Sequence, residues 1–129
     1  MKMISNKQSN GDMRHKDGVR GFTEREYRYL MERSLARIAF VCEDSQPHIV
    51  PVIYEFDGRY LYLSGWNLKY SPRFQDLDEE KITLLVDDLE SANRLIPRGI
   101  EVTGLVETKE KDEKLYLRIT PVGKTSWGL

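Results

Sequence analysis

The sequence predicts a mainly β protein, an antiparallel six-stranded barrel with two short helices. Segments rich in β-branched and aromatic residues recur along the chain, turn residues separate them, and most connections are short. Short connections favour antiparallel neighbours, and six strands of this length commonly close into a barrel. The chain therefore has the pattern of one β domain with helical additions.

A helix is the first predicted element, and it begins after Phe22. Thr23 and Glu26 have the spacing of a capping box, and Phe22 with Tyr27 has the spacing of a hydrophobic staple. Apolar residues then recur at helical spacing, so we expect a helix of about a dozen residues over one end of the fold.

Six strands follow, with predicted ranges Ala36–Glu43, His48–Phe56, Tyr60–Ser64, Lys81–Asp88, Gly99–Lys109 and Lys114–Val122. Asp57-Gly58 between the second and third strands is a strong hairpin signal. A charged turn at Glu110–Glu113 joins the last two strands. These ranges make 21–129 a single domain, whereas residues 1–20 are polar and aperiodic and are interpreted as a flexible arm.

Pro51 interrupts the second strand, and a proline cannot donate a hydrogen bond to a β-ladder. Two interpretations stay open. We favour a bulge that bends the strand for barrel closure. The alternative is an open strand edge, whose backbone groups could hydrogen-bond a ring system.

The segment Tyr60–Asp76 has the features of a phosphate site. It contains a strand-end corner and the start of a short helix over 72–77, made by Ser64, Gly65, Trp66, Asn67, Ser71, Pro72 and Arg73. Ser71 is a good N-cap residue and Pro72 a good first helical residue. The free N–H groups and dipole of such a helix attract anions, and the guanidinium of Arg73 suits phosphate. The alternative is a surface helix with a solvated arginine.

Composition argues against several classes of protein. A formal net charge of −1 gives no reason to expect binding to nucleic acid or to an anionic membrane. No segment approaches the roughly 20 apolar residues of a membrane span, and the start lacks the apolar block of a signal peptide. The single cysteine, Cys42, lies in an apolar run and fits a reducing compartment, so we expect a cytoplasmic protein.

The common catalytic constellations are missing from the sequence. His15 and His48 have no Cys or His at metal-ligand spacing, so no metal site is expected. No Gly-rich loop follows the first strand, and Cys42 has no histidine near it in the sequence. No catalytic side chain can be named, and any chemistry would come from a bound cofactor. The acidic pair Asp87-Asp88 is interpreted as part of a solvated face.

The order of elements resembles the pyridoxamine 5′-phosphate oxidase-like superfamily of flavin- and deazaflavin-binding split β-barrels. The matching stretches lie across residues 24–129 and read LARIAFVCEDSQPHIVPVIYEFDGRYLYLSG, SPRFQDL, RGIEVTGLVE and ITPVGKTSWGL. A small-chain, deazaflavin-dependent branch, with the same Gly-X-Asn corner and Ser-Trp-Gly tail, is the most similar. The resemblance implies a homodimer with cofactors in the grooves between subunits.

The resemblance also implies which residues hold the cofactor. Ser71 and Arg73 would hold its phosphate, and the corner Ser64, Gly65, Trp66 and Asn67 would touch the ribityl chain or the ring. The second strand would lie beside the ring at Val50, Pro51, Val52 and Ile53. Arg98 and Trp127 would come from the partner subunit. Trp66 could instead cap the barrel mouth, and Trp127 could anchor the tail.

Arg73 and Pro72 depart from the family pattern. The phosphate-gripping residue is commonly lysine, and Pro72 removes one backbone donor from the site. The chain also lacks the extended C-terminal segment that recognises the vitamin in true pyridoxamine phosphate oxidases, so no role in vitamin B6 metabolism is assigned.

The expected function is that of an oxidoreductase in which a bound flavin or deazaflavin exchanges hydride with an unidentified small molecule. We favour FMN, because the sequence has one clear basic pair for a short phosphate tail; the deazaflavin coenzyme is the alternative. A second hypothesis is a barrel that binds flavin without turnover, as a carrier or sensor. A third is a plain dimeric interaction domain.

Overall fold

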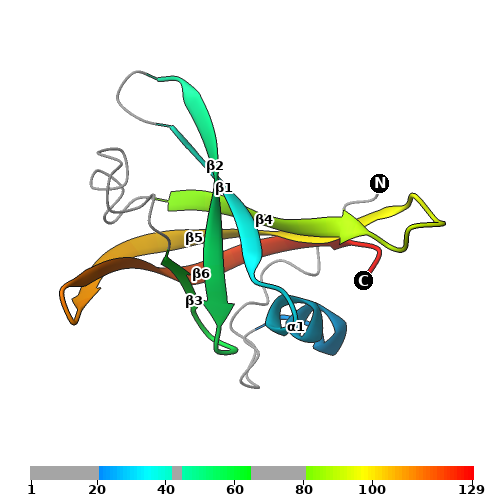
Figure 1. The fold of residues 1–129 in the computed structure, drawn as a ribbon, viewed down its shortest axis with the longest axis horizontal. Helices are drawn as coiled ribbons and strands as arrows, with labels where there is room; N and C mark the ends of the chain where they lie inside the picture. The colour runs from blue at the N-terminus through cyan, green and yellow to red at the C-terminus, as the bar shows by residue number, and fades with distance from the viewer. Residues whose placement is uncertain (1–20, 42–44, 65–80) are drawn as a thin grey trace.

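The computed structural model describes residues 21–41, 45–64 and 81–129. These residues form α1 (Glu24–Met31), β1 (Leu35–Val41), β2 (Pro47–Phe56), β3 (Leu61–Ser64), β4 (Lys81–Leu89), β5 (Pro97–Lys111) and β6 (Lys114–Trp127). All paired strands are antiparallel, and they close into a barrel in the order β1-β2-β3-β6-β5-β4 (Figure 1). The predicted mainly β, six-stranded antiparallel barrel is confirmed. The arm at 1–20 and the helix at 72–77 lie outside the described residues.

The N-terminus of α1 has the predicted capping box. The Thr23 hydroxyl accepts a hydrogen bond from the Glu26 N–H at 3.1 Å, and Glu26 Oε1 accepts one from the Thr23 N–H at 2.9 Å. The helix has eight residues, fewer than predicted. It ends early because the chain joins the sheet directly after it: the Ser34 carbonyl already accepts a hydrogen bond from the Tyr54 N–H at 2.9 Å.

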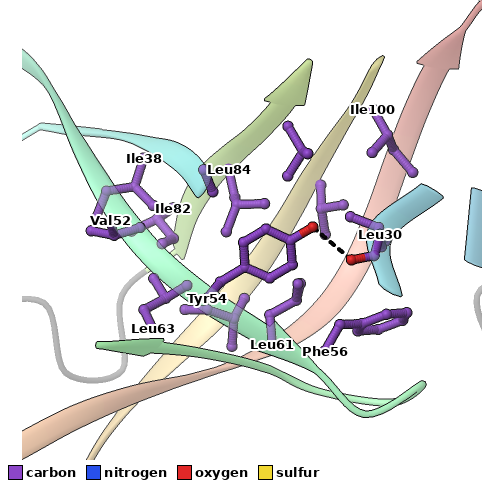
Figure 2. Packing of buried hydrophobic residues seen from close by; sticks show 14 of the residues in the cluster. Leu30, Ile38, Val52, Tyr54, Phe56, Leu61, Leu63, Ile82, Leu84 and Ile100 are labelled. Atoms are coloured by element: carbon purple, nitrogen blue, oxygen red, sulfur yellow. Dashed lines mark hydrogen bonds between the residues drawn. The ribbon is translucent and has the colours of Figure 1, made fainter. Parts of the chain in front are cut away.

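The barrel interior is filled by alternate residues of each strand. In β1, Ala36, Ile38 and Phe40 are buried, whereas the residues between them face outward. Tyr54 of β2 lies at the centre of the core, and its hydroxyl donates to the Leu30 carbonyl at 2.7 Å, which ties α1 to the barrel (Figure 2). Burial of one such large side chain contributes about 1.5–3 kcal/mol.

The β5–β6 hairpin is longer than predicted at both ends. Asp112 and Glu113 have φ angles of 55° and 65°, the left-handed conformation of a two-residue hairpin turn, so the predicted four-residue turn is wrong. At the other end β6 continues through Pro121 as far as Trp127. Pro121 is tolerated because the β5–β6 register shifts between Thr103 and Gly104, which leaves Val122 as an extra residue in β6.

The extra residue decides which side chains of β6 face the barrel interior. Before it, Leu117 and Ile119 are buried; after it, Lys124 and Ser126 turn inward toward α1. Lys124 Nζ lies 2.6 Å from Glu26 Oε1, and Ser126 Oγ donates to Glu26 Oε2 at 2.6 Å. The capping glutamate is therefore also a buried partner of the last strand.

The structure corrects the preferred interpretation of Pro51. β1 and β2 pair in an unbroken register from Leu35 opposite Ile53 to Val41 opposite Pro47, so the predicted bulge is wrong. β3 pairs with β2 only from Ile53 to Phe56. Among the described strand pairs, the part of β2 that contains Pro51 pairs with β1 alone, and the open-edge interpretation stays a prediction.

Candidate cofactor site

The predicted site residues fall into two groups. Those of the phosphate segment lie outside the described residues, namely Gly65, Trp66, Asn67, Ser71, Pro72 and Arg73. The others lie on four strands: Val50, Pro51, Val52 and Ile53 on β2, Ser64 at the end of β3, Arg98 on β5 and Trp127 on β6.

The four residues of β2 divide between the two faces of the sheet. Val52 is buried in the core and Val50 packs against it, so their side chains face the barrel interior. Pro51 and Ile53 are exposed on the outer surface. Ser64 lies opposite Ile53, which brings the end of β3 beside this outer surface. A ring lying against the outside of β2 would therefore contact side chains at alternate positions only.

Exposed apolar side chains extend from β2 onto β1. The exposed fractions are 69% for Ile49, 63% for Val41, 49% for Ile53 and 48% for Leu35. We call the surface made by these four residues and Pro51 the outer apolar face. The register places Leu35 opposite Ile53, and directly opposed side chains on one face lie about 4.5–5.5 Å apart at Cβ. The outer apolar face is therefore continuous across both strands.

A single arginine interrupts this apolar surface within the described strands β1 and β2. Arg37 of β1 lies opposite Pro51 of β2 on one side and opposite Leu85 of β4 on the other. Its Nη1 donates to Asp87 Oδ1 at 3.2 Å, and both side chains are partly exposed, at 48% and 39%. No local sequence pattern points to this pair, because 50 residues separate its two members.

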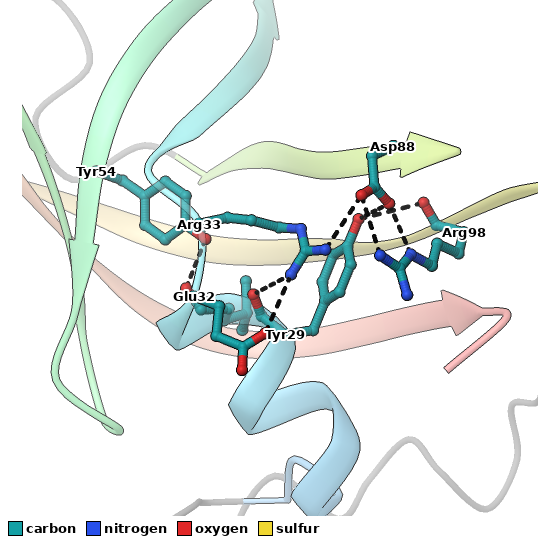
Figure 3. A network of polar contacts seen from close by, with 7 residues as sticks. Tyr29, Glu32, Arg33, Tyr54, Asp88 and Arg98 are labelled. Carbon is teal, nitrogen blue, oxygen red and sulfur yellow. Dashed lines mark hydrogen bonds and ion pairs between the residues drawn. The ribbon is translucent and has the colours of Figure 1, made fainter. Parts of the chain in front are cut away.

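Arg98 is held by the chain's own acidic residue. Its Nε and Nη2 donate to the two oxygens of Asp88 at 2.8 and 3.2 Å, and Arg33 donates to the same carboxylate at 3.1 Å (Figure 3). The Tyr29 hydroxyl donates to Asp88 Oδ1 at 2.8 Å. The solvated-face interpretation fits Asp87, which is exposed, whereas Asp88 is partly buried and binds two guanidinium groups.

These contacts shift two pKa values. The hydrogen bonds from Arg98, followed by those from Tyr29 and Arg33, hold the pKa of Asp88 far below its usual range. Burial, followed by the hydrogen bond to Asp88, raises the pKa of Tyr29. Asp88 is therefore an anion and Tyr29 a neutral donor at neutral pH, and the cluster joins α1, β4 and β5.

Trp127 lies opposite Gly99 and is partly exposed at the end of β6. Two residues later, Leu129 packs against the core, so the chain's own barrel holds the tail. The contribution of Arg98 and Trp127 to a neighbouring subunit stays a prediction.

The described residues offer limited chemistry of their own. They contain no group of three or more His, Cys, Asp or Glu side chains that could hold a metal ion. Among them, no helix has the length and apolar character that crossing a membrane requires. The outer apolar face with its arginine fits a flat, largely apolar ring that also carries polar edges. A cofactor of that kind, rather than a side chain, would supply the redox chemistry.

Comparison with solved structures identifies the fold. The FAD-binding protein from Mycobacterium smegmatis superposes with a TM-score of 0.61 at 18% identity, over 81% of this chain and 92% of that protein. A protein from Corynebacterium glutamicum, provisionally described as a pyridoxamine 5′-phosphate oxidase, superposes with a TM-score of 0.60 at 21% identity, over 81% of this chain and 88% of that protein. An FAD and heme binding protein from Mycobacterium smegmatis superposes with a TM-score of 0.65 at 16% identity, over 81% of this chain and 70% of that protein. The chain thus has the fold of pyridoxamine 5′-phosphate oxidase-like barrels, as the resemblance implied.

One curated protein with a similar sequence is described by the reaction that it catalyses. The 5a,11a-dehydrotetracycline/5a,11a-dehydrooxytetracycline reductase of Streptomyces rimosus subsp. rimosus is 24% identical over 84% of this chain and 84% of its own length. No model of a known protein family matches the sequence.

Proposed function

We propose that this chain is an oxidoreductase that uses a bound flavin or deazaflavin to exchange hydride with a small organic substrate. The observation that carries the proposal is the outer apolar face on a barrel whose fold is shared with FAD-binding proteins. The similarity to a reductase supports turnover in addition to binding. When bound, such a cofactor supplies the hydride chemistry.

The chain's own residues bind and orient this cofactor. Pro51 and Ile53 support the ring, and Ser64 leads into the corner that reaches the ribityl chain. In this proposal Ser71, Arg73 and the N–H groups of the helix that the sequence predicts over 72–77 hold the phosphate. Exclusion of water from the ring comes from apolar side chains, with Trp66 and Trp127 on the substrate side.

A second copy of the chain completes the site in this proposal. Exposed apolar surface of this kind marks a binding region, and Leu105 on β5 and Val122 on β6 are further exposed apolar residues. A homodimer that buries part of this surface leaves a groove along β2 for the cofactor.

The choice of cofactor is FMN, with the deazaflavin coenzyme as the alternative. FMN has a short tail that a single phosphate site at Ser71 and Arg73 can hold. The reductase relative and the resemblance to a deazaflavin-dependent branch favour the alternative. Titration of the purified protein with FMN, FAD and a 5-deazaflavin coenzyme, followed by absorbance and fluorescence, distinguishes them.

The sharpest test of the phosphate site is Arg73→Ala. Loss of a charge-assisted hydrogen bond costs about 1.5–3 kcal/mol, so the dissociation constant for the preferred cofactor should rise by roughly 10- to 150-fold. Arg59→Ala, which removes an exposed arginine from the β2–β3 turn, is the matched control and should leave binding unchanged. Equal affinity of wild type and Arg73→Ala would remove Arg73 from the site.

A carrier that binds flavin without turnover is the second candidate, because both neighbours from Mycobacterium smegmatis reported above are described only as binding proteins. Reduction of the bound cofactor by a nicotinamide donor, followed by reoxidation with an added organic acceptor, separates the two functions. Repeated cycles indicate an enzyme, whereas a cofactor that stays in one redox state indicates a carrier.

A further inference from the structure

Arg37 is the unusual residue of the outer apolar face. Its neighbours along β1, Leu35 and Ala39, are apolar on the same face, and its cross-strand neighbours are Pro51 and Leu85. A long charged side chain in such a setting keeps its head in water or gives it a partner. A surface ion pair adds little to folding stability, so the pair with Asp87 is a weak reason to keep an arginine here.

The Arg37 guanidinium also has more N–H donors than its ion pair with Asp87 uses. It carries five N–H donors, and among the described residues only Nη1 has a hydrogen-bond partner, the Asp87 carboxylate. Arg37 lies opposite Pro51 on the outer face of the sheet, where the proposed ring lies. A guanidinium binds planar groups with polar edges especially well, because its donors lie in a rigid plane.

We propose that Arg37 sets the redox preference of the bound cofactor by placing positive charge beside its ring, and that Asp87 limits this effect. The inference rests on the proposed function. Hydride from a reduced organic donor brings two electrons and one proton, so a neutral ring gains one negative charge and the donor loses the same hydride. Positive charge from Arg37 stabilises the reduced, anionic ring over the neutral oxidised one.

Under this proposal, substitutions of Arg37 and of Asp87 change the affinity for the reduced cofactor in opposite directions. Arg37→Gln removes the positive charge and weakens binding of the reduced cofactor more than binding of the oxidised one. Asp87→Asn leaves the guanidinium uncompensated and strengthens binding of the reduced form. A pair that served only the fold would give changes of the same sign, since either substitution breaks the same contact.

The experiment measures dissociation constants for oxidised FMN and for dithionite-reduced FMN under anaerobic conditions. For Arg37→Gln, the ratio of the oxidised to the reduced constant should fall about tenfold. That fall lowers the midpoint potential of bound FMN by about 30 mV, as for any two-electron couple. For Asp87→Asn the ratio should rise, and for Arg37→Lys, which keeps the charge, it should stay within about twofold of wild type.

Arg118→Gln is the matched control, because Arg118 is likewise ion-paired, with Glu107 at 2.6 Å, but lies on β6 away from Pro51. Its ratio should equal that of wild type. If Arg37→Gln does not fold, the rise in Asp87→Asn alone carries the test. Shifts of the same sign in both variants, or no shift in a protein that binds FMN, overturn this inference and leave the proposed function intact. Absence of binding to FMN, FAD and the 5-deazaflavin coenzyme overturns both.

Discussion

Lys124 and Glu26 form an ion pair whose side chains are only 5% and 6% exposed. The Glu26 carboxylate also receives hydrogen bonds from the Thr23 N–H and the Ser126 hydroxyl, so its charge is well satisfied only while all partners remain. Removal of one member of a buried pair leaves an uncompensated charge in a poorly hydrated site.

Lys124→Met should therefore lower the free energy of unfolding by about 3–5 kcal/mol. The double variant Glu26→Gln with Lys124→Met should recover part of this loss, because no buried charge remains. Urea denaturation followed by circular dichroism measures both. Lys109→Met is the control: Lys109 Nζ lies 4.0 Å from Glu107 on the surface, and its loss should cost less than about 1 kcal/mol. An unaltered Lys124→Met midpoint would contradict the role of the buried pair.

Asp88 predicts a pH dependence of stability. Its pKa in the folded state lies below the unfolded value of about 3.9, so its contribution is fully present well above that value and is lost as the pH falls below it. Because the side chain is 37% exposed, solvent screening makes the contribution modest. Asp88→Asn should melt at a lower temperature than wild type at pH 7, and the difference should narrow at pH 3. A constant difference between pH 7 and pH 3 would be inconsistent with this account.

The β6 bulge depends on Gly104, because there is no room for a side chain at that position. A Cβ on Gly104 would meet Ile119 Cγ2 and would lie 2.7 Å from the Thr120 carbonyl oxygen. A Cβ on Gly123, on the other side of the same bulge, has no heavy atom within 4 Å. The two glycines thus lie at the same bulge but differ in the space available for a side chain, so their alanine variants can be compared directly.

Gly104→Ala should destabilise the protein by about 1–3 kcal/mol through overpacking. Gly123→Ala should change stability by less than about 0.5 kcal/mol, as for an ordinary surface substitution. Thermal melts of the two variants under the same conditions make the comparison. Equal melting temperatures would show that the backbone near Gly104 relaxes at little cost.

The elements that could be predicted from sequence are those with strong local signals. Thr23 and Glu26 predicted the helix start, and alternation around Ile38 and the Asp57-Gly58 turn predicted the first three strands to within two residues at each end. The end of β6 was missed because Pro121 is an ordinary strand breaker unless a bulge accommodates it. The ion pairs of Asp87 with Arg37 and of Asp88 with Arg33 and Arg98 were not predicted, because strand register, a long-range property, brings these residues together.

At the scale of the whole molecule, the outer apolar face is the surface for which the proposed homodimer is the expected cover. Ile49→Glu places a charge at its most exposed apolar residue and should shift the protein from dimer to monomer in sedimentation velocity runs. Leu95→Glu is the control, since Leu95 is 72% exposed in the loop between β4 and β5. A wild-type protein that sediments as a monomer at all concentrations would refute the dimer.

Val122 is the one residue of β6 that could be lost without turning the rest of the strand over. Without it, Pro121 and Gly123 would be consecutive and would still lie opposite Gly104 and Thr103, so strict alternation would run through the whole strand. Lys124 would stay opposite the buried Val102, and with Ser126 it would still face α1. Loss of a second residue from the same stretch would instead turn Thr125 toward the helix and Lys124 toward water. Between Thr120 and Lys124 the chain therefore has a single spare position, and a deletion of two residues would break the contact with Glu26.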